Sequence, residues 1–127
     1  MGVELAAWPD VHDVLFALFQ DLADTVAGPR RPPNYQDQMP LVWVRRLGGA
    51  DDRITDVARV DVEVYASTYP TARDLATALQ QRLLAAPHIT PAGRIDTVET
   101  EVGPREIPHD DQAVRLVAAT YRISFRR

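Results

Sequence analysis

The segment Arg59–Tyr65 restricts the fold more than any other part of the chain, because its apolar and polar residues alternate strictly. Three valines fall on one side of an extended backbone, and the other side is polar apart from a tyrosine; the apolar positions are Val60, Val62 and Val64, and the others are Arg59, Asp61, Glu63 and Tyr65. A period of two is typical of a strand with one buried face. The sequence therefore predicts a sheet with one face covered and the other face polar.

Other segments complete the predicted sheet. Residues 48–52 are glycine and aspartate apart from one alanine, and they separate an apolar strand from the longer strand Arg53–Ala66, which indicates a hairpin. Val57 is out of phase with Val60, so we expect a bulge near Asp56. The remaining strands are predicted at Leu41–Leu47, Arg94–Val102 and Val114–Arg126.

Two segments have apolar residues at three- and four-residue spacing, which predicts helices. The first follows Asp10, a plausible N-cap, and continues for about five turns to residues 28–29. The second covers residues 70–86, and Thr71 and Asp74 have the spacing of a capping box.

The predicted order is helix, hairpin, helix, hairpin. We therefore expect an α+β fold with a four-stranded, mainly antiparallel sheet and both helices on one face. The chain has 127 residues, of which 46% are hydrophobic and 25% charged, and these values fit one ordinary globular domain over residues 1–127.

Composition excludes several classes of function. The chain has no cysteine, so disulfides, zinc-cysteine sites and thiol catalysis are ruled out. Its formal net charge of -4 argues against a protein whose main task is to bind nucleic acid. No apolar stretch approaches the ~20 residues that a membrane-spanning helix needs, and we expect a soluble protein without a membrane association.

The residues do not form a recognisable catalytic pattern. The two serines do not lie in a nucleophile elbow, and the histidines lack the spacing of a helical zinc pair. His109, Asp110 and Asp111 are the only cluster of metal-ligand types, and in a proline-flanked loop they favour a polar turn over a ligand site. We expect no enzyme activity and no cofactor, and a binding or structural role.

Two features suggest contacts with other subunits. Residues 30–38 form a proline-rich arm without apolar periodicity, and a loop of this length is usually functional or disordered. Phe16 lies outside the apolar stripe of the first helix, so its ring either tucks under the following loop or contacts another subunit.

The chain as a whole resembles the tail terminator proteins of long-tailed phages that infect actinobacteria. Four segments carry the resemblance: 41–53, 56–66, 72–84, and 101–111 together with 119–124. The resemblance implies a non-catalytic virion protein, made in the bacterial host cytoplasm, that forms a hexameric ring. Such a ring caps the head-proximal end of the tail tube and joins it to the head connector.

Two alternatives remain open at this stage. The first is a neck, or head-completion, protein of the same joint, since neighbouring proteins of similar length share the α+β plan. The second is a small ligand-binding or enzymatic domain that uses the loop His109–Asp111.

The resemblance supplies no functional motif, so the site predictions come from the residues themselves. Subunit contacts of a ring are heterologous, and exposed loops are the natural place for them. The predicted interface residues are Arg30, Arg31, Tyr35, Trp43, Asp51, Asp52, Arg105 and His109.

A second predicted set faces the lumen of the ring. Carboxylates on the polar sheet face would repel phosphates, so DNA would pass through without specific binding; an ordinary solvated sheet face with alternating charges is the alternative. The predicted lumen residues are Asp61, Glu63, Glu99 and Glu101.

Overall fold

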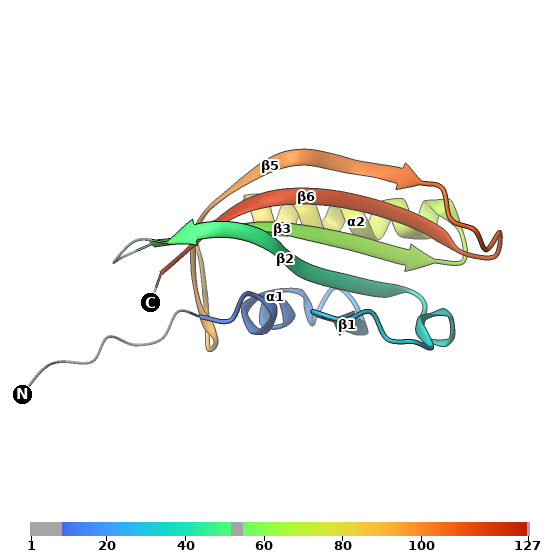
Figure 1. The fold of residues 1–127 in the computed structure, drawn as a ribbon, viewed down its shortest axis with the longest axis horizontal. Coiled ribbons are helices and arrows are strands. Elements are labelled where there is room, and N and C mark those ends of the chain that lie inside the picture. Colours follow the sequence, from blue (N-terminus) through green and yellow to red (C-terminus); the bar gives the residue numbers. More distant parts are fainter. Residues whose placement is uncertain (1–8, 52–54, 127) are drawn as a thin grey trace, which may run out of the picture.

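The computed structural model describes residues 9–51 and 55–126, and Figure 1 shows their arrangement. The elements, in chain order, are α1 (Val11–Phe19), β1 (Thr25–Ala27), the 3-10 turn η1 (Tyr35–Gln38), β2 (Leu41–Asp51), β3 (Thr55–Ala66), α2 (Tyr69–Leu84), β4 (His88–Thr90), β5 (Gly93–Ile107) and β6 (Arg115–Arg126).

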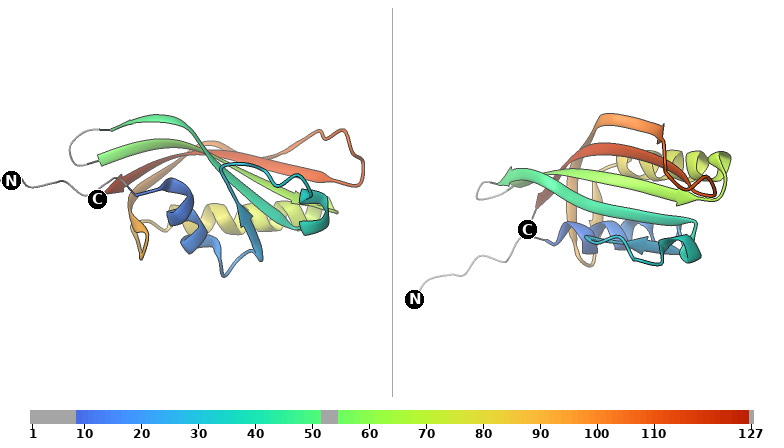
Figure 2. Two further views of the ribbon diagram at one scale, coloured as in Figure 1. Left: turned by 60° about the horizontal axis from the view of Figure 1, so that its bottom comes forward. Right: turned by 45° about the vertical axis from the view of Figure 1, so that its right-hand side comes forward.

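All the strands join one curled sheet in the order β1-β2-β3-β6-β5-β4. The β1–β2 pair is parallel, and the other pairs are antiparallel. The sheet bends like half a barrel, and α1 and α2 lie inside the bend (Figure 2). The prediction of a four-stranded sheet in a helix-hairpin-helix-hairpin plan is therefore wrong: the sheet has six strands and is mixed.

The missing strand β1 comes from a segment that the sequence predicts as helix. Val26 continues the apolar spacing of α1, but α1 ends at Phe19, and residues 25–27 pair with β2 instead. Gly28 does not stop a helix; a Cβ there would overlap the carbonyl oxygen of Val44 on β2. The glycine therefore allows the chain to cross β2 closely after leaving β1.

The missing strand β4 has only three residues, too few to show an alternating pattern. It pairs with the first residues of β5, and β5 runs on to Ile107, past the predicted end at Val102. A register shift between Val102 and Arg105 accommodates Pro104, which lacks a backbone donor.

The bulge and one helix cap also differ from prediction. The β2–β3 register shifts between Arg46 and Gly48, so the bulge lies in β2 rather than near Asp56. The helix α2 is capped by Thr68, whose hydroxyl accepts from the Thr71 backbone N–H, and not by a capping box from Thr71. The N-cap at Asp10 is confirmed: its carboxylate accepts from the backbone N–H of His12 at 2.8 Å.

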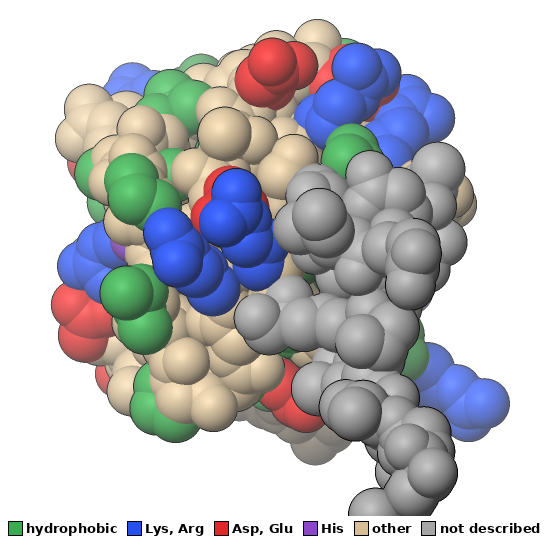
Figure 3. Space-filling model, turned by 90° about the vertical axis from the view of Figure 1, so that its left-hand side faces the viewer, with side chains coloured by type: hydrophobic (Ala, Val, Ile, Leu, Met, Phe, Trp, Pro, Cys, Tyr) green, Lys and Arg blue, Asp and Glu red, His purple; other side chains and the backbone are tan. Residues whose placement is uncertain are grey.

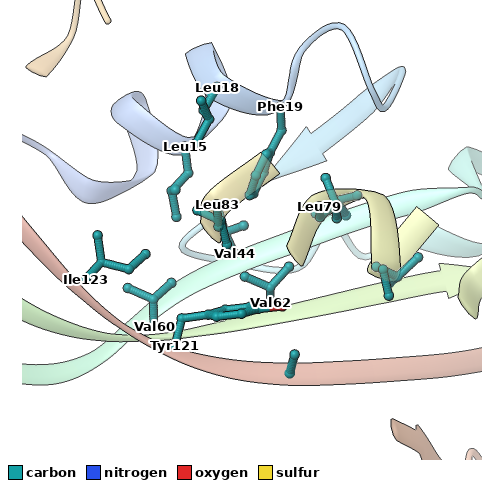
Figure 4. Close-up of a cluster of buried hydrophobic side chains, with 14 of the residues drawn as sticks. Leu15, Leu18, Phe19, Val44, Val60, Val62, Leu79, Leu83, Tyr121 and Ile123 are labelled. Carbon is teal, nitrogen blue, oxygen red and sulfur yellow. The ribbon is translucent and has the colours of Figure 1, made fainter. Parts of the chain in front are cut away.

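The main core lies between the two helices and the concave face of the sheet. Figure 4 shows side chains of α1, α2 and the central strands meeting there, among them Phe19, Leu79 and Tyr121, and the three are at most 1% exposed. The valines of the alternating segment of β3 point into this core, as their spacing predicts. The opposite face of the sheet, called the helix-free face below, carries neither α1 nor α2 and holds most of the predicted site residues that the structure describes.

Candidate subunit interface

A second, smaller apolar cluster lies on the helix-free face of the sheet. Tyr65 of β3 is opposite Leu41 of β2 and Leu116 of β6, so the three side chains share one face. The arm then places Tyr35 on them, with ring centroids of Tyr35 and Tyr65 5.1 Å apart. The arm is therefore a packed part of the subunit, anchored by a tyrosine that is 8% exposed.

Arg31 of the arm lies over the aromatic rings of this cluster. Its guanidinium carbon is 4.3 Å from the ring centroid of Tyr35 and 5.5 Å from that of Tyr65. It also donates to the Tyr65 hydroxyl at 3.3 Å, and that hydroxyl donates to a carboxylate oxygen of Glu63 at 2.9 Å. The arm is thus held by cation–π contacts and a short hydrogen-bond chain.

The three residues of this hydrogen-bond chain have shifted pKa values. Burial raises the pKa of Tyr65 to about 12, so the phenol stays protonated and can donate to Glu63. Burial also raises the pKa of Glu63, although the Tyr65 hydrogen bond opposes the shift. The hydrogen bond to Tyr65 raises the pKa of Arg31, whose charge is therefore permanent.

The arm also contacts the loop between β5 and β6. The Tyr35 hydroxyl lies 2.9 Å from Nε2 of His109, and the Gln36 amide donates to Asp111 at 2.7 Å. Nδ1 of His109 accepts the backbone N–H of Asp111, so the neutral ring carries its proton on Nε2 and donates to Tyr35. Asp111 accepts the backbone N–H of Ala113 as well, which confirms the polar-turn interpretation of this loop.

Trp43 lies on the helix-free face, whereas its neighbours Val42 and Val44 are buried in the main core. The indole N–H donates to the carbonyl oxygen of Pro29 at 2.9 Å and so fixes the start of the arm. The guanidinium of Arg45 lies 4.6 Å from the indole centroid. The half-buried indole is therefore a support for the arm and not a member of the helix-side core.

The predicted interface residues separate into two groups. Arg31, Tyr35, Trp43 and His109 meet in the cluster around Tyr65, as the contacts above show. Arg30 and Arg105 are exposed outside it. Asp51 ends β2, roughly 30 Å of strand away from Leu41, and Asp52 lies outside the described residues. Sequence reasoning missed Tyr65, although an aromatic residue among the polar positions of β3 was a usable signal.

The four predicted lumen carboxylates share the helix-free face, but most of them have partners there. Asp61 is 8% exposed and 3.4 Å from Arg45, and Glu101 lies between Arg59 and Arg122. Glu63 accepts the Tyr65 hydroxyl but has no ion-pair partner within the described part of the chain, and neither has Glu99. The face is consequently a mixed-charge network and not a continuous acidic surface.

Within residues 9–51 and 55–126, no group of three or more acidic or histidine side chains could hold a metal ion. In the same part of the chain, no helix is both long and apolar enough to cross a membrane. A hollow of about 500 Å³, open and lined mainly by polar atoms, is formed by the β5–β6 loop around His109. The candidate functional site on this face is therefore the arm, together with the aromatic residues beneath it and the β5–β6 loop that contacts it.

Comparisons with known proteins agree with a structural role. The sequence signature of the phage tail termination proteins matches residues 7–127. A chain from the virion of a native gene transfer agent particle has a similar fold, with a TM-score of 0.55 and 17% sequence identity over 92% of this chain and 87% of that chain. No curated protein matches the chain. Because the signature covers nearly the whole sequence, this chain belongs to the phage tail termination protein family, a family of structural tail proteins.

Proposed function

We propose that six copies of this chain form a closed ring on the head-proximal end of a phage tail tube. The ring ends the growth of the tube and presents its other side to the head connector. The observation that carries the proposal is the match of the tail termination signature over residues 7–127. The protein is made in the host cytoplasm and acts in the virion, where it carries out no catalysis.

Contacts of the ring come from the loops and the arm. Arg30 and Arg105 are exposed outside the aromatic cluster, and Asp51 ends β2, at the opposite end of that strand from Leu41. Asp52, the next residue in the sequence, belongs to the same proposed contact. Two such separate patches on one subunit suit a heterologous contact, in which one patch meets a different patch on the neighbour. Arg31, Tyr35, Trp43 and His109 hold the arm in the shape that the neighbour meets.

The helix-free face lines the channel in this proposal. Its paired charges leave few sites at which a phosphate could replace a counterion, so DNA passes without specific binding. Glu99 is the lumen residue that can be tested most cleanly, because it is exposed and has no ion pair among the described residues. Glu99→Arg rings should bind DNA at low salt more tightly than wild-type rings, and an unchanged affinity would argue against this face as the lumen.

The main test uses particles that lack this chain. A missing terminator leaves tube growth without a stop, so tails should be longer and variable in length, and they should not join to heads. Adding the purified chain during assembly should restore one length. Tails of normal length that merely fail to join would instead support a neck protein.

A further inference from the structure

Ile89 is the most exposed large hydrophobic side chain among the described residues, at 84%. It is the middle residue of β4, the strand at one edge of the sheet, and projects from the end of the molecule where the β4–β5 turn lies. An exposed isoleucine on its own is common, so its surroundings decide whether it has a role.

Basic side chains flank Ile89. Its partner across β4 and β5 is Arg94, and the partner of Arg94 across β5 and β6 is Arg126, so the three share one side of the sheet. Both arginines are about half exposed and share a single carboxylate, Asp96. This end of the molecule carries arginines beside hydrophobic side chains, as Figure 3 shows. The isoleucine is thus an apolar projection with a net positive border.

A groove of about 400 Å³ with a negatively charged border lies beside β1, the strand at the other edge of the sheet. It is lined by Phe16, Ala17, Gln20, Ala23, Asp24 and Val26. The floor is mainly apolar, and Phe16 packs only partly on the core. Asp24 is exposed, as is Asp13, which precedes Ala17 by one helical turn. Neither carboxylate has an ion-pair partner within the described ranges.

We propose that Ile89 of one copy inserts into the groove of a second copy, with Arg94 facing Asp24. Apolar shape and charge are complementary, since a projection bordered by arginine meets a hollow bordered by aspartate. Projection and groove lie at opposite edges of the same sheet, so the contact is heterologous and repeats from subunit to subunit, as a closed ring requires. The inference rests on the proposed ring and names one of its contacts.

The first test changes Ile89→Asp and measures assembly by light scattering over a range of protein concentrations, alone and on tail tubes. The exposed site makes a folding defect easy to exclude by circular dichroism. We expect assembly to need at least about tenfold more protein, because a carboxylate cannot enter the apolar groove beside Asp24. The matched control is Tyr69→Asp. Tyr69 is an exposed aromatic residue at the N-terminal end of α2, away from β4, and this variant should assemble as wild type does.

The second test reverses the charges. Asp24→Arg and Arg94→Asp should each weaken assembly, and the double variant should restore most of it. Since the chain has no cysteine, Ile89→Cys with Ala17→Cys can also be oxidised, and it should give a ladder of linked subunits that neither single variant gives. No rescue and no ladder would overturn the inference.

The outcomes separate this contact from the ring itself. If wild-type chain assembles and the Ile89→Asp variant assembles at the same concentration, the contact is wrong and the ring stands. If the wild-type chain does not assemble even when tail tubes are present, the proposed function is wrong, and so is the contact.

Discussion

The two faces of the sheet bury their side chains in different ways. On the concave face, two helices cover aliphatic and aromatic residues that need no polar partner, such as Leu79 and Phe19. On the other face, a few rings around Tyr65 are held by Arg31 and Glu63 through directed hydrogen bonds. Burial of this first kind stabilises in proportion to area, whereas the second kind depends on geometry. The comparison suggests that the helix side provides stability and that the helix-free side fixes the shape of the arm.

The strongest test of this difference is Leu79→Ala on the helix side. Leu79 is fully buried, so the change leaves a cavity and should lower the free energy of unfolding by about 2–5 kcal/mol. Urea unfolding of the monomer measures the loss. The same substitution at Leu84, which is 48% exposed on the same helix, is the control, and an equal loss at both sites would contradict the assignment of the core.

On the helix-free side, Tyr65→Phe keeps the ring and removes the hydroxyl. We expect a loss of about 1 kcal/mol, because the links to Arg31 and Glu63 disappear while the apolar contacts stay. Hydrogen exchange should become faster in the arm and remain unchanged in α2. If exchange becomes faster throughout the chain, the hydroxyl supports the whole fold and not the arm alone.

Two neighbouring arginines of the arm, Arg30 and Arg31, allow a matched comparison with a smaller expected effect on stability. Arg31→Ala should cost about 0.5–1 kcal/mol, the usual value of an exposed cation–π contact. Its neighbour Arg30 is exposed and has no hydrogen bond, ion pair or ring contact among the described residues, so Arg30→Ala should leave the unfolding free energy nearly unchanged. Equal losses for the two variants in urea unfolding would show that charge in general, and not the ring contact, supports the arm.

The smallest effect concerns pH. Burial raises the pKa of Glu63, so the folded state favours the protonated carboxyl, and its contribution to stability is lost as pH rises through the raised pKa. Glu63→Gln keeps an acceptor for Tyr65 and removes the buried charge. We expect the variant to gain stability over wild type near neutral pH and to lose that advantage near pH 4. A variant that is less stable than wild type near neutral pH would show that the ionised Glu63 carboxylate stabilises the fold, contrary to this prediction.

The same contrast explains what the sequence could predict. Alternation in residues 59–65 correctly identified a strand and its buried side, since period-two burial is a local property. It could not identify β1 and β4, because three-residue strands depend on a partner and not on their own pattern. For Val26, pairing with β2 prevailed over a helical spacing.

The site shows a similar limit. The composition of the arm indicated a binding segment, and Arg31, Tyr35, Trp43 and His109 do lie together, but no local pattern could show that they meet on their own subunit. Whether they also support a neighbour depends on assembly. The paired state of Asp61 and Glu101 was equally hidden, because their arginine partners come from other strands.

The central claim is a ring at the end of the tail tube, and a reconstruction of the assembled tail by electron cryomicroscopy tests it most directly. We predict a closed ring of copies of this chain at the head-proximal end of the tube, with the helix-free face toward the channel and the helices outward. A chain located elsewhere in the particle, or a ring with α1 and α2 lining the channel, would contradict this account.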